Sequence, residues 1–166
     1  MTSLFCHPTH AEDQRNAHAI LYLHVMRAST MSFAFLSLFR LPVSILRGTR
    51  PIDMSVLLAQ TLRSSGRAAV IGIAVGAIAT WGRMRGREEI EWQDRSWRVL
   101  ENEGEVKTDW ITIAGSGAGA AAAALAARRG AIMMGMGEAL LGGVGAGSSV
   151  GTPYMIATFA AGRKSA

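Results

Sequence analysis

From about residue 50 onward the chain alternates long apolar segments with short charged ones, a pattern that predicts helices in a membrane. Residues 68–82 and 110–127 contain no charged side chain, and residues 131–151 contain only one, Glu138. Uncharged runs that approach roughly 20 residues are typical of transmembrane helices. We therefore predict an all-α membrane protein with two to three transmembrane helices, over about 68–82, 110–127 and, as an open third, 131–151.

The residues that end these runs are those expected at a membrane surface. Trp81 closes the first run and Trp110 opens the second, and tryptophan is enriched where the hydrocarbon meets the headgroups. Arg67 and Arg83 flank the first run and extend it, because long basic side chains reach toward the headgroups. We interpret Trp81 and Trp110 as interface anchors. Basic residues on both sides leave the membrane orientation open.

The segment between these tryptophans, residues 83–109, is dense in charge. Glu91 and Arg95 lie four residues apart, as do Asp94 and Arg98, which is the spacing of ion pairs along one face of a helix. We therefore predict an aqueous, partly helical loop between the first two spans.

Glycines recur at intervals of four residues within each apolar run. Helices in lipid associate by close backbone contact, which small residues at this spacing permit. The predicted helix-packing glycines are Gly72, Gly76, Gly115, Gly119, Gly143, Gly147 and Gly151. Because alanine and glycine are weakly hydrophobic, these segments are expected to be buried among other helices.

Glu138 is the one acid inside a predicted span. An isolated acid at that depth costs about 3 kcal/mol, which usually means that it has a partner or lines a water-filled path. A proton or ion relay is one interpretation. We favour a carboxylate that is paired with an arginine or amide of a neighbouring subunit, or one that a tilted helix leaves near the interface. If this third segment lies on the surface instead, only two spans remain.

Residues 1–50 differ in composition from the rest of the chain. No acid lies between Asp13 and Asp53, while arginines recur among Ser, Leu and Phe. This composition is typical of a mitochondrial targeting segment. A weak membrane anchor is an alternative, but Arg40 and Pro42 interrupt its apolar run. The chain thus divides into a basic targeting segment or N-terminal extension (1–50), a helical membrane domain (51–162) and a tail (163–166).

Charge narrows the possible partners. Only 17% of the residues are charged, against about a quarter in an ordinary globular protein. The net charge is +5, but the basic residues are scattered instead of gathered with aromatics, which argues against nucleic acid as a partner. One cysteine and four histidines near the N-terminus form no strong metal-site pattern. We predict no metal, no cofactor and no small-molecule substrate.

The second apolar run also contains a fragment of a dinucleotide-binding fingerprint. Gly115-x-Gly117-x-x-Ala120 fits the required glycine spacing, and Glu138 lies about 20 residues further on, where a ribose-binding acid is expected. Such a site needs a buried strand before the glycines and a second strand carrying the acid. The residues around the fingerprint contain few β-branched side chains and many glycines. We favour the membrane interpretation and keep a dinucleotide-binding protein as an alternative.

Three blocks of the sequence carry a resemblance to a known family. They are "RPIDMSVLLAQTLRSSGRAAVIG", "EIEWQDRSWRVLENEGEVKTDW" and "GEALLGGVGAGSSVGTPYMI". Together they resemble the fungal NUXM family of accessory membrane subunits of mitochondrial NADH:ubiquinone oxidoreductase, or complex I. The resemblance covers about Arg50 to Gly162 and implies an inner-membrane protein with about two transmembrane helices and no redox centre. It implies no catalytic residues, and the first fifty residues have no counterpart in it.

The expected function is therefore that of a non-catalytic accessory subunit of respiratory complex I. It would pack against the core membrane subunits and lipids of the mitochondrial inner membrane, while other chains carry out electron transport. A small inner-membrane translocase or carrier component is the alternative, because glycine-zipper hairpins with basic turns also resemble the inner-membrane protein-import family.

Overall fold

The computed structural model describes residues 4–39 and 53–161, and within these ranges the chain forms helices and no strand. The prediction of an all-α protein is confirmed. The elements are a 3-10 helix η2 (Ala11–Asp13) and the α-helices α1 (Ala17–Leu38), α3 (Met54–Met84), α4 (Glu89–Glu101), α5 (Glu103–Arg128), α6 (Met136–Ser148) and α7 (Gly151–Ala160).

Three of the described helices, α1, α3 and α5, are long and apolar enough to cross a membrane. Helices α3 and α5 contain the predicted spans 68–82 and 110–127. The third candidate is α1, which lies in the segment that we expected to be a targeting sequence or an extension. An acid-free composition fits both possibilities, because the acids that pair with this segment lie on α4 and α5, far along the chain.

The region expected as a third span, residues 131–151, is not one continuous helix. Gly130 has a φ of 69°, a left-handed conformation that ends α5, and α6 begins only at Met136 and stops at Ser148. The Ser148 hydroxyl donates to the carbonyl oxygen of Gly145 at 2.8 Å. Serine hydroxyls that bond to nearby backbone oxygens weaken a helix, and the chain restarts as α7 at Gly151.

Both α3 and α5 begin well before the apolar runs that they contain, because polar side chains cap them. Asn102 Oδ1 accepts hydrogen bonds from the amides of Gly104 and Glu105 at 3.0 and 3.3 Å. Asp53 accepts from the amide and hydroxyl of Ser55, and these bonds hold the pKa of the Asp53 carboxyl below its usual range. The predicted loop 83–109 is consequently mostly helix, shared between α4 and the start of α5.

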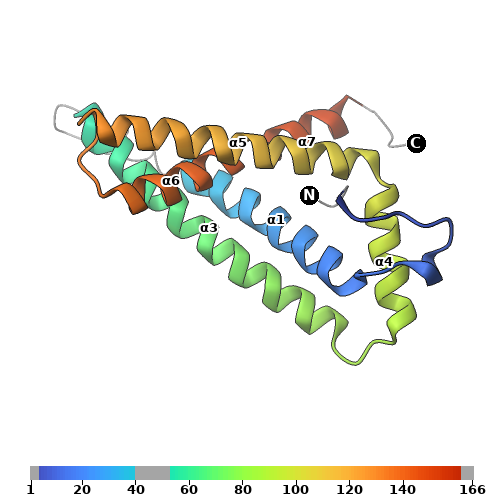
Figure 1. The fold of residues 1–166 in the computed structure, drawn as a ribbon. Helices are drawn as coiled ribbons and strands as arrows, with labels where there is room; N and C mark the ends of the chain where they lie inside the picture. Colours follow the sequence, from blue (N-terminus) through green and yellow to red (C-terminus); the bar gives the residue numbers. More distant parts are fainter. Residues whose placement is uncertain (1–3, 40–52, 162–166) are drawn as a thin grey trace.

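Helices α3 and α5 approach each other at one end and diverge toward the other, where α4 connects them (Figure 1). Helix α1 lies between them and packs mainly along α3, while α6 fills the narrow end between α3 and α5. Trp81 and Trp110 are both at the wide end, since one lies near the end of α3 and the other near the start of α5.

The residues before α1 and the first turn of α1 pack against α4. The Trp97 indole donates to the Pro8 carbonyl oxygen at 2.8 Å. The His18 ring stacks on Trp92 with 3.9 Å between centroids, and its Nε2 lies 2.8 Å from Glu89 Oε2. These contacts tie the N-terminal segment to the charged region between the two predicted spans. Whether residues 1–50 act in targeting stays a prediction, and residues 1–3 and 40–52 lie outside the described residues.

Candidate functional site: a buried charge cluster and glycine contacts

A cluster of charged side chains joins α1 to α5. Arg27 of α1 lies between two carboxylates of α5, with Nε 2.6 Å from Asp109 Oδ1 and Nη2 2.6 Å from Glu105 Oε2. The side chains of Arg27 and Asp109 are only 4% and 1% exposed, whereas that of Glu105 is 25% exposed. Glu105 and Asp109 are four residues apart, so they lie on one face of α5. One guanidinium therefore bridges two like charges that would otherwise repel.

Further polar and sulfur atoms complete the surroundings of Arg27. His24 Nδ1 lies 3.3 Å from Arg27 Nη2 and 3.9 Å from Glu105 Oε2. Arg27 Nη1 lies 3.3 Å from the Met31 sulfur, which also accepts from the Thr112 hydroxyl at 3.8 Å. Within the part of the chain that the structure describes, no three His, Cys, Asp or Glu side chains are placed to hold a metal ion. The arrangement suits an ionic clamp between two helices.

Such a clamp is stabilising only while it is complete. Transfer of the charges out of water costs free energy that their attraction roughly repays, but removal of one partner leaves a buried charge without compensation. Local sequence carries two weak signals for this cluster: Arg27 is the one Lys, Arg, Asp or Glu within Ala17–Leu38, and like charges recur at residues 105 and 109. The pairing of Arg27 with residues 105 and 109 leaves no pattern among neighbouring residues in the sequence.

The glycines of α3 lie where α1 approaches most closely. A Cβ atom added to Gly72 would lie 2.7 Å from the Thr30 Cα, and one added to Gly76 would lie 2.7 Å from the Met26 Cα. These distances are shorter than real side chains adopt, so only glycine allows the two backbones to pack at this separation.

Helices α5 and α6 meet through glycine on both sides. Gly115 faces Gly147 and Gly119 faces Gly143, and a Cβ on any of the four would collide with the backbone of the opposite helix. Gly151 faces the Met31 sulfur, 2.8 Å from the position of an added Cβ. All seven glycines expected to pack helices thus lie at helix contacts.

Two glycines outside the expected spacing make a similar contact. Gly142 and Gly145 of α6 face the backbone of α3, where a Cβ on Gly142 would lie 2.7 Å from the Leu62 carbonyl carbon and one on Gly145 would lie 2.5 Å from that of Ser65. Because α6 lies between α3 and α5, it needs small residues on two faces. The four-residue spacing describes only the face toward α5.

The residues of the dinucleotide fingerprint lie within a helix, whereas a nucleotide site requires a strand before the glycines. Residues 110–113, the would-be strand, lie inside α5, which begins at Glu103. Amides within a continuous helix bond to its own carbonyls and cannot cradle a phosphate. Gly115 packs against α6, whereas nothing lies within 4 Å of a Cβ built on Gly117. The glycines of the fingerprint thus belong to a helix surface.

A family model described as "Protein of unknown function (DUF1757)" matches residues 9–144. The chain belongs to this family. No curated protein and no solved structure matches the chain. The matched range of the DUF1757 model contains α1, α3, α4, α5 and every residue of the charge cluster.

In this DUF1757 protein Glu138 lies in the first turn of α6, near the surface. Its carboxylate lies 3.3 Å from Arg63 Nε of α3, and the two side chains are 55% and 42% exposed. We expected an arginine from a neighbouring subunit or a position near the interface. The arginine comes from the same chain, and because α6 begins only at Met136, Glu138 lies close to a helix end.

The two tryptophans expected as anchors are exposed on the surface of the DUF1757 fold. Trp81 is 54% exposed, with the Arg85 guanidinium carbon 5.0 Å from its ring centroid, and Trp110 is 48% exposed. Both positions are compatible with a headgroup layer at the α4 end of the molecule.

Proposed function

We propose that this DUF1757 protein is a non-catalytic accessory subunit of a large membrane assembly, and that the assembly is mitochondrial complex I. The observation that carries the proposal is the outward face of α5. Only 11% of its most apolar stretch is buried within the chain, against 28% for the corresponding stretches of α1 and α3. Most of α5 is therefore available to surroundings outside the chain.

The outward faces of α3 and α5 differ in chemistry. That of α3 is rich in bulky aliphatic side chains, as expected for contact with lipid: Val70, Ile71, Ile73, Val75 and Ile78. The outward face of α5 consists mainly of small residues at helical spacing: Ala114, Gly117, Ala118, Ala121 and Ala122. Small residues gain little from contact with lipid, but they permit close approach of another helix. The α5 face therefore fits a helix of a partner subunit.

The choice of complex I rests on the three sequence blocks that resemble the NUXM family. Among the described residues these blocks form more than half of α3, all of α4 with the start of α5, and most of α6 and α7. On this proposal the protein lies in the mitochondrial inner membrane and stabilises the assembly, while electron transfer and proton pumping belong to other chains.

Ala118→Leu tests the partner face directly. The longer side chain is expected to leave the isolated protein within about 0.5 kcal/mol of its normal stability, because the position is exposed. Incorporation into the assembly is expected to fall severalfold on a native gel, since the partner helix can no longer approach. Ala74→Leu, the same change on the outward face of α3, is the matched control and is expected to assemble normally. Equal incorporation of both variants would contradict the assignment of the α5 face.

The membrane and subunit parts of the proposal are tested separately. Mitochondrial membranes are washed with alkaline carbonate, and the retained protein is followed on a native gel with an in-gel NADH dehydrogenase stain. We expect retention in the membrane and migration with complex I. Release into the wash would overturn the membrane assignment, and migration as a small free species would overturn the subunit assignment.

Glu138→Gln separates the subunit from the carrier alternative. The Arg63 pair is exposed on both sides, and such pairs contribute about 0–1 kcal/mol. We therefore expect near-normal thermal stability and normal assembly. Loss of a transport activity in mitochondria that assemble complex I normally would instead favour the carrier.

A further inference from the structure

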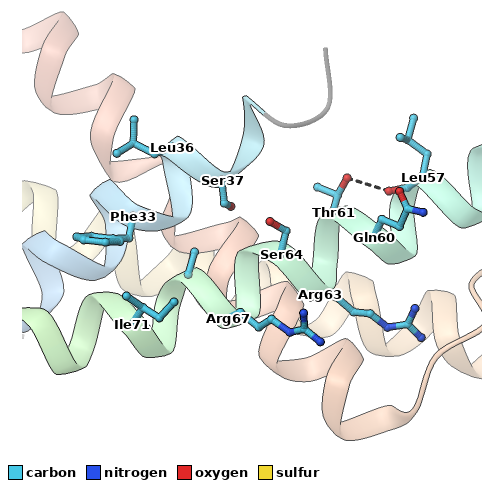
Figure 2. A pocket seen from close by; sticks show the side chains of 11 residues that line it. Phe33, Leu36, Ser37, Leu57, Gln60, Thr61, Arg63, Ser64, Arg67 and Ile71 are labelled. Atoms are coloured by element: carbon cyan, nitrogen blue, oxygen red, sulfur yellow. Dashed lines mark hydrogen bonds between the residues drawn. The ribbon is translucent and has the colours of Figure 1, made fainter. Parts of the chain in front are cut away.

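A groove lies between the second half of α1 and the first half of α3 (Figure 2). It has a volume of about 680 Å³, within the range of roughly 300–1,000 Å³ that small-molecule sites occupy. Phe33, Leu36, Leu57 and Ile71 supply apolar surface, and Arg63 and Arg67 supply positive charge. Figure 2 shows the two guanidinium groups one turn apart on the same side of α3.

The depth of the two arginines follows from their positions along α3. At 1.5 Å per residue, Arg67 and Arg63 lie about 21 and 27 Å along α3 from the exposed Trp81. The second distance is close to the ~30 Å thickness of the hydrocarbon layer. If Trp81 marks one surface of the bilayer, the arginines lie toward the opposite headgroups.

Phe33 and Ile71 lie on the bilayer side of both arginines, whereas Leu36 is level with the arginines and Leu57 lies beyond them. Gly76 meets Met26, Gly72 meets Thr30, and the Ser65 and Ser37 hydroxyl oxygens are 3.2 Å apart, so α1 and α3 are antiparallel. In this register Phe33 lies between the levels of Gly72 and Ser65. Phe33 and Ile71 therefore lie nearer the bilayer centre than Arg63 does.

The two arginines differ in the ion-pair partners that they have among the described residues. Arg63 pairs with Glu138 at 3.3 Å and also lies 3.5 Å from the Met133 carbonyl oxygen. Among the described residues, no carboxylate lies within ion-pair distance of the exposed Arg67. Two cations and one carboxylate leave one positive charge uncompensated. Ser64 and Gln60 also line the groove and offer neutral hydrogen-bond donors beside this charge.

We propose that this groove binds an anionic phospholipid. The phosphate lies at Arg67 and Arg63 with Ser64 and Gln60 beside it, and an acyl chain passes Leu36 at the level of the arginines and follows Phe33 and Ile71 toward the bilayer centre. A guanidinium is suited to a phosphate because it donates two parallel hydrogen bonds. The inference rests on the proposed membrane location but not on membership of complex I.

Binding is tested on the full chain purified in a neutral detergent and titrated with tetraoleoyl cardiolipin, with dissociation constants from native mass spectrometry. Arg67→Gln is expected to weaken binding about fivefold, and Arg63→Gln combined with it to weaken binding further. Glu138→Gln releases Arg63 from its carboxylate and is expected to bind at least as tightly as the unmodified protein. Arg129→Gln removes an exposed arginine at the end of α5, outside the groove, and is expected to have no effect.

Several outcomes would overturn the proposal. An Arg129→Gln variant that loses as much affinity as Arg67→Gln would show attraction to overall charge alone. Equal affinity for dioleoyl phosphatidylcholine would show that the anionic headgroup is not selected. Displacement of cardiolipin by millimolar inorganic phosphate would identify a free phosphate site instead of a lipid site.

Occupancy in the membrane is tested with a photoreactive residue in place of Leu36, which is 62% exposed. Adducts with phospholipid are expected after illumination of native membranes. Adducts with protein alone would mean that a protein segment fills the groove, and would overturn the proposal. Arg67→Gln is also expected to remain in carbonate-washed membranes. If the variant is retained in the membrane but does not bind lipid, the proposed subunit role stays intact. Release of the variant into the wash would contradict that role.

Discussion

Arg27→Met is expected to destabilise the protein by about 3–5 kcal/mol, the cost of breaking a buried ion pair from one side. The Asp109 side chain is 1% exposed, so its charge cannot be hydrated when the guanidinium is gone. Glu105 is 25% exposed and retains access to solvent. For a chain of this size the loss corresponds to a fall of roughly 10 °C in melting temperature, measured in detergent by tryptophan fluorescence.

Two further variants make this prediction specific. Arg63→Met removes an arginine from the exposed pair with Glu138 and is expected to cost less than about 1 kcal/mol. Arg27→Met combined with Asp109→Leu removes both buried charges, and it is expected to recover much of the stability that Arg27→Met loses. If Arg27→Met and Arg63→Met melt at the same temperature, the cluster does not hold α1 against α5.

Gly119→Leu is expected to destabilise the protein by about 3 kcal/mol or more, because the obstacle is backbone and cannot change rotamer. Any side chain at this position meets the Gly143 carbonyl oxygen, and a Cβ alone would lie 3.0 Å from the Gly147 Cα. Helix α6 must then move away from α5. Thermal unfolding in detergent measures the loss, and the steady-state abundance of the variant in expressing cells provides an independent measurement.

Gly117→Ala is the matched control, two residues away on the same helix. Nothing lies within 4 Å of its added Cβ, and alanine in a helix is more stable than glycine by roughly 0.5–1 kcal/mol. We therefore expect unchanged or slightly higher stability. This variant also tests the dinucleotide alternative, in which Gly117 must approach a pyrophosphate. Nicotinamide nucleotide binding that Gly117→Ala abolishes would contradict the helix-packing interpretation.

The fold class and two of the long helices were predictable because their signals are local. The lack of charge in residues 68–82 and 110–127 predicts membrane helices, and this property depends only on neighbours along the chain. The caps at Asp53 and Asn102 set where α3 and α5 begin. The spacing of Gly115 and Gly119 is likewise local, since it places both glycines on one face of α5.

Other features depend on residues that are distant in sequence. The role of Arg27 in the apolar run of α1 depends on Glu105 and Asp109, which lie 78 residues or more away along the chain. Glu138 likewise finds its partner only across the fold, because α6 begins at Met136 and places the carboxylate beside Arg63 of α3. In both cases the environment of a charge decides its role, and that environment is made by other helices.

The amino-acid sequence by itself determined that this DUF1757 protein is helical, that α3 and α5 suit a membrane, and where small residues interrupt its apolar faces. Only the tertiary structure decided that α1 packs along α3, that α6 lies between α3 and α5, and that Arg27 is shared by two carboxylates. The physical reason is the separation along the chain over which each property is determined. Helix formation and hydrophobicity are set within a few turns of the chain, whereas burial and charge pairing exist only once separate helices have packed together.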